Sequence, residues 1–291
     1  MKYVSMDIVR FKGGLGNQMF QYALVEALRS RGREVYCNLG FYRRHPDLRP
    51  FIIEQVFRNL NLNEIDDSAF DKVDEKWKKI KNDENKLKNY KKDNKNIFFY
   101  VENEDGKYDE DIFKTINCTF VGYWQSEKYF KNIRNQILRV FDFTNLEPKL
   151  KEFGEQLKKT YISIHIRRGD YLKFAMYQTI SLEYYWNSID YINNIFPDAK
   201  FIVFSDDTNW VSKIFDLDNM IVCKPEFFDD YKDWYDMYLM TLCKGNIIAN
   251  SSFSWWGAWL NKNEKAITIS PRKWLDGYET PDIWCDKWIR I

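Results

Sequence analysis

Two adjacent arginines, Arg167 and Arg168, directly follow an apolar segment that is typical of a buried strand. In parallel α/β sheets, ligands bind beyond the carboxyl ends of the strands, and a guanidinium group there can hold two phosphate oxygens at once. Because successive residues point to opposite sides, we expect only one of these arginines to contact a phosphate. The alternative is that both form ordinary ion pairs, for example with Asp170. His165 shares the side of Arg167, although a lone histidine is more often a packed residue than a catalytic one.

A glycine-rich turn near the N-terminus could also approach a diphosphate. Residues 13–18 read Gly-Gly-Leu-Gly-Asn-Gln and separate a strand pattern from a helical pattern. They lack the lysine of a P-loop and make a poor dinucleotide fingerprint, because the helix begins at once. Gly14 and Gly16 would let backbone N–H groups come close to a phosphate at the helix N-terminus. Asn17 is either the N-cap of that helix or a donor to a ligand.

Two further segments place polar side chains after apolar strand patterns. Asp206 and Asp207 form the first, and one of these carboxylates can accept from the N–H groups of a purine while the other caps the following helix. Ser251, Ser252 and Phe253 open a tryptophan-rich helix whose hydroxyl and N–H groups could seat a phosphate. We assign the tryptophans of this helix to the core rather than to a sugar-stacking platform, because their spacing is near-helical.

These motifs need a scaffold of alternating strands and helices. Such alternation predicts parallel sheets covered by helices on both faces. We expect an α/β fold with two Rossmann-like domains, residues 1–150 and 151–291, a cleft between them and a boundary in the polar segment 145–159. The predicted strands are 3–11, 35–37, 161–166, 200–204, 219–223, 246–249 and 266–269, and the predicted helices are 17–31, 182–195, 209–215, 231–243 and 254–260.

Composition excludes several classes of protein. A chain of 291 residues suits two domains, and its net charge of +1 gives no overall field to attract nucleic acid or anionic lipid. Five cysteines without a C-x-x-C pair indicate a reducing compartment, and two histidines exclude a metal site built from several imidazoles. Residues 1–10 lack the apolar core of a signal peptide, and no apolar run reaches the length of a membrane span. We expect the Lys-rich segment 71–96 to be a solvated helix or a mobile excursion.

Taken together, the motifs resemble those of the α-1,2-fucosyltransferases of glycosyltransferase family 11. The resemblance covers nearly the whole chain, with the matching segments in the same order. These segments are residues 13–21, 122–130, 165–171, 205–207, 250–256 and 271–274.

The resemblance implies a GT-B fold whose C-terminal domain holds GDP-fucose and whose N-terminal domain, with its Gly-rich loop, supplies most acceptor contacts. It implies that Arg167 clamps the diphosphate, that His165 reads guanine together with one of the two aspartates, and that the loop 14–17 closes over the donor. The donor-binding residues that it implies are Gly14, Gly16, His165, Arg168, Asp206, Asp207, Ser251, Ser252 and Phe253.

The implied reaction moves L-fucose to the 2-hydroxyl of a terminal β-galactoside with inversion, in one displacement. Arg167 and helix N-termini would stabilise the departing GDP without a metal or other cofactor. Asp170 is the nearest candidate for the base but could equally orient Arg167, and Asn17 could position the hydroxyl. The partners would be GDP-fucose and a galactose-containing oligosaccharide, and the expected location is the cytoplasm, with attachment to the inner membrane left open.

Three alternatives stay open at this stage. A GT-B fucosyltransferase that forms a 1,6 linkage, or one that modifies a peptide hydroxyl, would share the arginine motif. A non-catalytic glycan-binding module would use the tryptophans but would leave the arginine and glycine motifs unexplained. A nucleotide-binding regulator is less favoured, because no P-loop lysine follows the glycines.

Overall fold

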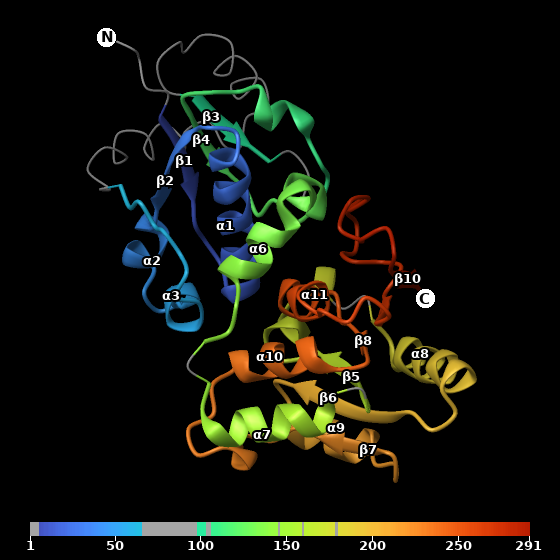
Figure 1. The fold of residues 1–291 in the computed structure, drawn as a ribbon. Coiled ribbons are helices and arrows are strands. Elements are labelled where there is room, and N and C mark those ends of the chain that lie inside the picture. The colour runs from blue at the N-terminus through green and yellow to red at the C-terminus, as the bar shows by residue number, and fades with distance from the viewer. Residues whose placement is uncertain (1–5, 66–97, 103–105, 145, 159, 178–179) are drawn as a thin grey trace. The chain divides into compact units, whose positions relative to one another are not determined.

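The computed structural model describes residues 6–65, 98–102, 106–144, 146–158, 160–177 and 180–291, which divide into two compact α/β units (Figure 1). Unit 1 contains the described residues up to Asp142 together with Pro281–Ile283. Unit 2 contains those of Phe143–Thr280 and Trp284–Ile291. The Lys-rich segment 71–96, for which a solvated helix or a mobile excursion was predicted, lies outside the described residues.

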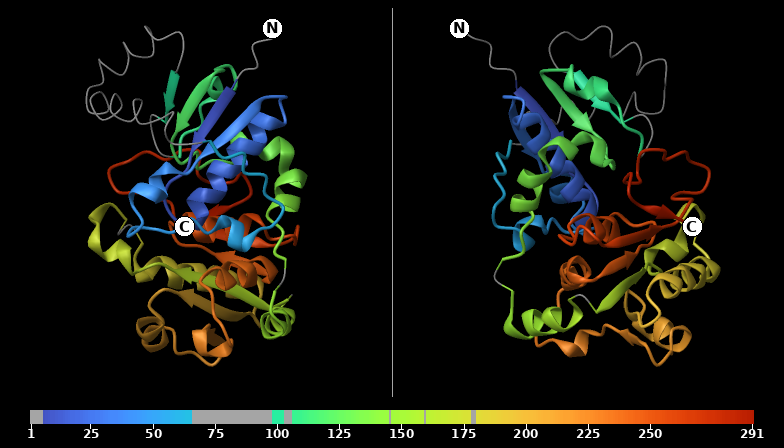
Figure 2. Two further views of the ribbon diagram at one scale, coloured as in Figure 1. Left: turned by 90° about the vertical axis from the view of Figure 1, so that its left-hand side faces the viewer. Right: turned by 45° about the vertical axis from the view of Figure 1, so that its right-hand side comes forward.

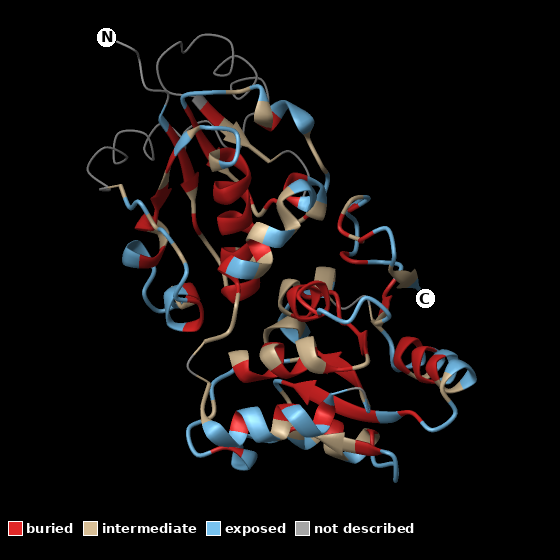
Figure 3. Ribbon diagram, viewed as in Figure 1, coloured by how far each residue is buried: buried red, intermediate tan, exposed pale blue. Residues whose placement is uncertain are grey.

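Unit 1 is built on a four-stranded parallel sheet with the order β2-β1-β4-β3. Helix α1 (Leu15–Arg29) connects β1 to β2, and nearly all of its side chains are buried (Figure 3). The predicted unit of strand, glycine turn, helix and strand is confirmed. The strands are β1 (Met6–Arg10), β2 (Glu34–Asn38), β3 (Phe98–Val101) and β4 (Cys118–Val121), and the shorter helices are α2 (Gly40–Arg44), α3 (Ile53–Val56), η2 (Glu110–Phe113), η3 (Glu127–Tyr129), η4 (Lys131–Ile133) and α6 (Arg134–Val140).

Unit 2 is built on a six-stranded parallel sheet with the order β10-β9-β8-β5-β6-β7. Its central strand β5 has the bounds that the sequence predicts, and every predicted strand of this half is present. The strands are β5 (Tyr161–Ile166), β6 (Lys200–Ser205), β7 (Met220–Val222), β8 (Gly245–Ile247), β9 (Ile267–Ser270) and β10 (Ile289–Arg290), and short 3-10 helices occur at η5 (Asp170–Lys173), η6 (Ala175–Tyr177) and η7 (Pro225–Phe227).

Helices cover both faces of this second sheet (Figure 2). On one face, α8 (Leu182–Ile195) and α9 (Thr208–Ile214) pack against alternate residues of β5 such as Ile164. On the other face, α10 (Trp234–Leu242) is tied to the sheet by the Nδ2 of Asn246, which donates to the Oγ of Ser163 at 2.7 Å and to the carbonyl of Met240 at 2.9 Å. Helix α11 (Ser252–Trp259) packs against α10.

The boundary between the units lies earlier than the sequence predicts. The expected boundary at residue 150 falls inside α7 (Pro148–Leu157), which packs on α10 so closely that a Cβ on Gly154 would lie 2.6 Å from a methyl carbon of Leu242. The division instead falls between Asp142 and Phe143. The exposed face of α7 gives its sequence the polar character of a linker, which explains the error.

Candidate functional site

Three neighbouring strands of unit 2 end in the predicted donor-binding residues. Because β5 lies between β6 and β8 and all three are parallel, the residues that follow them share one edge of the sheet. The backbone N–H of Arg168, after β5, donates to Asp206, after β6, at 2.9 Å. The hydroxyl of Tyr171 donates to the carbonyl of Asn250, after β8, at 3.1 Å. The structure therefore brings the three motifs together.

Arg167 is held between two carboxylates at this edge. Its Nε and Nη2 donate to one oxygen of Asp170 at 3.1 and 2.6 Å, and its Nη1 lies 3.0 Å from an oxygen of Asp206. A guanidinium group has five N–H donors in a planar fork, so these contacts leave at most two for a ligand. The side chain is 22% exposed, which leaves it accessible to a ligand. Asp170 accepts two hydrogen bonds from Arg167 through one oxygen, which favours an orienting role for this carboxylate over that of a base.

Asp206 shapes the loop that carries Arg167. One of its oxygens accepts the N–H of Arg168 and the other pairs with the guanidinium of Arg167. A Cβ on Gly169 would lie 2.5 Å from the second oxygen, so only glycine lets the carboxylate approach this closely. The recognition of guanine by Asp206 stays a prediction, whereas its contacts to the loop are part of the fold.

Arg168 and Asp207 form a separate pair. Asp207 caps α9 by accepting from the backbone N–H of Trp210 at 3.1 Å, and its other oxygen accepts from the Nε of Arg168 at 3.1 Å. The guanidinium of Arg168 also lies 3.7 Å from the centre of the Trp210 ring. The two arginines thus have different partners, and Asp207 is the helix-capping member of the aspartate pair.

His165 is buried at the end of β5 with its ring 5.6 Å from that of Phe253, in a stacked arrangement. Burial, and secondarily the positive charge of Arg167, lower the pKa of the imidazole to about 3, so His165 is neutral at physiological pH. Its Nδ1 is buried and has no hydrogen-bond partner within the described part of the chain. A neutral imidazole with an unused nitrogen suits the predicted contact to a nucleobase, which stays a prediction.

The start of α11 is capped from within. The Oγ of Ser251 accepts from the N–H of Phe253 at 3.3 Å, which leaves its O–H as a donor, and Ser252 begins the helix. A phosphate here would meet backbone N–H groups of the first turn. Trp255, Trp256 and Trp259 of the helix are buried, so their assignment to the core is confirmed and they form no exposed sugar platform.

Asn250 is a site residue to which the sequence analysis gave no role. Its Nδ2 donates to the carbonyl of Tyr177 at 3.0 Å and to that of Trp274 at 2.8 Å, and the side chain is buried. It therefore links three loops at the edge of the sheet. Its position inside segment 250–256, which resembles a family motif, is the sequence feature that could have identified it.

In unit 1, the glycine-rich loop leads from β1 into α1. Gly14 is the N-cap, with an extended backbone and no capping side chain, and the helix begins at Leu15. The alternative in which Asn17 is the N-cap is therefore wrong, because the residue already lies in the first turn. Its Oδ1 accepts from the Nε2 of Gln125 at 2.7 Å. Gly16 is buried beside it.

Gln18 fixes the shape of this loop. Its Nε2 donates to the carbonyls of Gly13 and Pro50 at 3.0 and 2.9 Å, and its Oε1 accepts from the N–H groups of Ile52 and Ile53 at 3.1 and 3.0 Å. The amide is fully buried with all four positions used. These hydrogen bonds therefore fix the loop conformation without a bound ligand.

We expect Gln18→Leu to lower the free energy of unfolding by about 2–3 kcal/mol, because it leaves buried N–H and carbonyl groups without partners. Urea unfolding followed by circular dichroism measures the loss. The exposed Gln55→Leu is the control and should change stability by less than about 0.5 kcal/mol. Equal stabilities for the two variants would contradict the structural role of Gln18.

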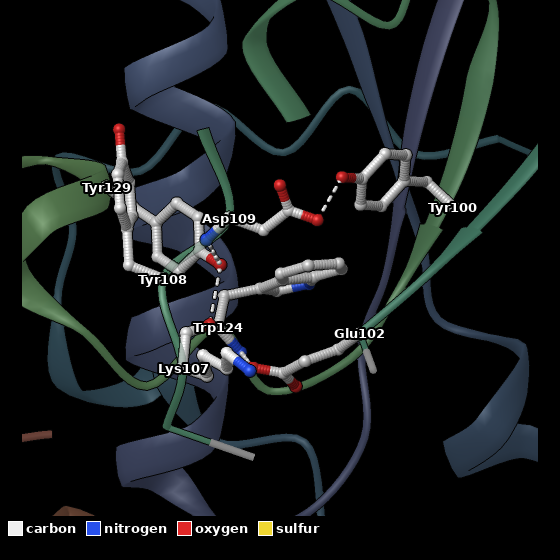
Figure 4. Close-up of a pocket in the computed structure, with 7 residues that line it drawn as sticks. All are labelled: Tyr100, Glu102, Lys107, Tyr108, Asp109, Trp124 and Tyr129. Atoms are coloured by element: carbon white, nitrogen blue, oxygen red, sulfur yellow. Dashed lines mark hydrogen bonds between the residues drawn. The ribbon is translucent and has the colours of Figure 1, made fainter. Parts of the chain in front are cut away.

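The segment after β4 carries Gln125 to Asn17. The carboxylate of Glu102 accepts from the N–H of Tyr123 at 2.6 Å and from that of Trp124 at 3.0 Å, and Trp124 has a φ of +59°. Figure 4 shows the indole of Trp124 between Asp109 and Glu102. Because Trp124 is fully buried, its indole forms part of the wall of a cavity and does not present a ring face to a ligand. The cavity of about 200 Å³ is lined by Tyr100, Glu102, Lys107, Tyr108, Asp109, Trp124 and Tyr129.

The described residues hold neither a candidate metal cluster nor a candidate membrane-spanning helix. They contain no group of three or more His, Cys, Asp and Glu side chains that could hold a metal ion. Among them there is also no helix of sufficient length and hydrophobicity to cross a bilayer.

The chain matches known glycosyltransferases over its length. Residues 2–291 match the family model for glycosyl transferase family 11. An alpha-1,2-colitosyltransferase of Escherichia coli is 31% identical over 99% of both chains. A galactoside 2-alpha-L-fucosyltransferase of Caenorhabditis elegans is 28% identical over 50% of this chain and 43% of its own.

Among solved structures, the NodZ alpha-1,6-fucosyltransferase from Bradyrhizobium has a TM-score of 0.51 at 14% identity, covering 88% of this chain and 92% of its own. This likeness and the two parallel sheets confirm the expected GT-B class of α/β fold. The family match extends over every motif described above, in both units. The chain therefore belongs to glycosyl transferase family 11.

Proposed function

We propose that this glycosyltransferase moves L-fucose from GDP-fucose to the 2-hydroxyl of a terminal β-galactoside, with inversion and without a metal ion. The observation that carries the proposal is the placement of Arg167 between Asp170 and Asp206, with up to two N–H donors left for phosphate oxygens. At the same edge of the sheet, the partly exposed ring of Phe253 stacks on the buried, neutral His165, and this pair suits contact with a nucleobase. Together they suit a nucleoside diphosphate.

In this reaction the bond between fucose C1 and the diphosphate oxygen breaks, and both electrons stay with the departing GDP. Arg167 stabilises the negative charge that builds up there, and its carboxylate neighbours keep the fork in place before the substrate arrives. The acceptor oxygen forms the new bond from the opposite face of the sugar. With Asp170 engaged by Arg167, the proton of the acceptor hydroxyl passes to solvent or to another base.

GDP-colitose is a second candidate donor, because the similarity to the colitosyltransferase extends over 99% of both chains. Colitose is L-fucose without its 3-hydroxyl, so the same diphosphate site would serve both sugars. A site built to hydrogen-bond that hydroxyl discriminates against the sugar that lacks it by up to about 10⁴-fold. The preference between the two donors is therefore large enough to measure directly.

The test is incubation of the purified protein with EDTA, lactose or N-acetyllactosamine, and either GDP-fucose or GDP-colitose. GDP release gives the rate, and linkage analysis of the product gives the bond formed. We expect a 1,2-linked fucosyl product at a rate unaffected by EDTA. Preference for GDP-colitose would move the proposal to the second donor, and a 1,6 linkage would contradict the acceptor position.

Loss of activity in EDTA with recovery on addition of manganese would refute metal independence. Glycan binding without any turnover would indicate a binding protein. Tight binding of GDP without transfer to either galactoside would keep the diphosphate site and reject the acceptor.

A further inference from the structure

Tyr171 follows Asp170 in the loop that carries Arg167, and it has no role in the reaction as described above. Its side chain is partly exposed, whereas its hydroxyl donates to the carbonyl of Asn250 at 3.1 Å. Burial raises the pKa of this hydroxyl to about 12, although a hydrogen bond from Ser251 and the positive charge of Arg167 oppose the increase. Tyr171 is therefore a neutral hydrogen-bond donor at physiological pH.

The ring of Tyr171 supports Arg167. The guanidinium carbon lies 5.7 Å from the centre of the ring, within the distance at which a cation is attracted to an aromatic face. This attraction uses none of the N–H donors of the guanidinium group, unlike the contacts to Asp170 and Asp206. The ring can therefore hold Arg167 in place and leave its remaining donors to phosphate oxygens.

The ring is itself held by a closed set of contacts. It stacks on the ring of Tyr177, with the two centres 4.6 Å apart and an angle of 21° between the planes. The carbonyl of Tyr177 accepts from the Nδ2 of Asn250 at 3.0 Å, and the carbonyl of Asn250 accepts from the hydroxyl of Tyr171. Because Asn250 is only 3% exposed, water competes little for these hydrogen bonds. The ring is thus preorganised before a substrate binds.

These contacts join two loops of unit 2 that carry predicted phosphate contacts. Tyr171 belongs to the loop after β5, which presents Arg167, and Asn250 belongs to the loop after β8, which leads into the first turn of α11. Because β5 and β8 are neighbours in the parallel sheet, both loops lie at the same edge. The hydroxyl of Tyr171 therefore ties the position of the ring, and with it that of Arg167, to the loop before α11.

We infer that Tyr171 is a positioning residue that holds the guanidinium of Arg167 in the orientation that receives the diphosphate. Its ring contacts the cation, and its hydroxyl fixes the ring to the loop after β8. The inference rests on the proposed function. As the C1–O bond breaks, negative charge grows on the departing GDP, and a guanidinium group that is already oriented stabilises this charge without reorganisation. Tyr171 acts through Arg167, keeps its proton and forms no bond to a substrate.

Substitution of Tyr171 separates its two contributions. Tyr171→Phe keeps the ring and removes the hydroxyl, and we expect it to lower kcat about threefold. Tyr171→Leu also removes the ring, and we expect a loss of about 20-fold with the KM for the acceptor unchanged. Phe174→Leu is the matched control and should change kcat less than about twofold, because Phe174 is an exposed ring of the same loop that contacts Tyr177 in an edge-to-face arrangement.

A double-mutant cycle with Arg167→Ala shows whether Tyr171 acts through Arg167. Calorimetry with GDP measures the affinity of the unmodified protein, of the two single variants and of the double variant. We expect Tyr171→Leu to weaken GDP binding about tenfold when Arg167 is present and less than about twofold when alanine replaces it. If Tyr171→Leu does not fold, Tyr171→Phe gives the same comparison, with a loss of about threefold that is absent in the Arg167→Ala background.

Equal losses of GDP affinity in the two backgrounds would overturn the inference, because a residue that only stabilises the fold acts independently of Arg167. Unchanged affinity and turnover in a folded Tyr171→Leu protein would overturn it as well, and so would a loss of the same size in Phe174→Leu. Thermal melts by circular dichroism establish that each variant is folded. If the unmodified protein binds GDP but transfers no fucose, the proposed function fails, and the cycle still decides the inference.

Discussion

Replacement of Arg167 by lysine is expected to lower the turnover of sugar transfer about 100-fold, and replacement by alanine about 1,000-fold, in a protein that still folds. The guanidinium fork bonds Asp170 and Asp206 at once and still has N–H groups left for phosphate oxygens. A lysine ammonium is a point charge that cannot satisfy both carboxylates and a diphosphate in one plane. Steady-state kinetics with GDP-fucose, and calorimetry with GDP, measure the loss.

Arg168→Lys is the matched comparison, because it makes the same chemical change at the neighbouring residue. Its guanidinium pairs with Asp207 and lies over Trp210, so we expect a loss of about tenfold or less. Circular dichroism and a thermal melt check that each variant is folded. Near-normal turnover of a folded Arg167→Lys protein would show that Arg167 is not a catalytic residue and does not clamp the diphosphate.

Much of unit 2 could be predicted because its strands are continuous apolar runs bounded by polar turns. The bounds of β5 and α8 are those expected, and the residues after β5, β6 and β8, which were predicted to face a ligand, lie at one edge of the sheet. Two strands of unit 1, β3 and β4, were not predicted. Both are apolar, but they are short. The two-residue strand β10 and the return of Pro281–Ile283 to unit 1 depend on tertiary contacts that no local pattern encodes.

The site was harder to predict than the fold, because a side chain's role depends on its partner. The sequence shows that Asp206 and Asp207 are adjacent. It does not show that Asp206 contacts the arginine loop while Asp207 caps a helix. The contact between Asn17 and Gln125 joins residues 108 positions apart, so no spacing rule announces it. Such pairs become visible only when the neighbouring strands place their loops at one edge.

A buried carboxyl outside the site should govern how stability changes with pH. Asp236, in α10, is 8% exposed, and one of its oxygens has no hydrogen-bond partner among the described residues. Burial raises the pKa of this carboxyl to about 8, and the negative charge of Asp233 adds to the increase, while hydrogen bonds from Tyr231 and Cys223 oppose it. Asp236 is therefore largely protonated in the folded protein at neutral pH.

The sign of the effect follows from the protons bound in each state. Between about pH 4 and pH 8 the folded protein keeps the proton of Asp236, whereas the unfolded chain has released it. Stability contributed by this group is thus fully present below about pH 4, falls as the pH rises, and is constant above about pH 8. Each pKa unit corresponds to about 1.4 kcal/mol, so the total change has an upper limit of about 6 kcal/mol.

We expect Asp236→Asn to raise the free energy of unfolding at pH 8 by about 2–4 kcal/mol and to have little effect at pH 4, because the amide has nearly the shape of the protonated acid and carries no charge. Urea unfolding between pH 4 and pH 9 measures both values. Asp218→Asn removes the same charge from an exposed position and should leave the slope unchanged. A variant whose stability parallels that of the unmodified protein at every pH would show that Asp236 is ionised in the folded protein. Water would then have to reach this carboxylate in α10.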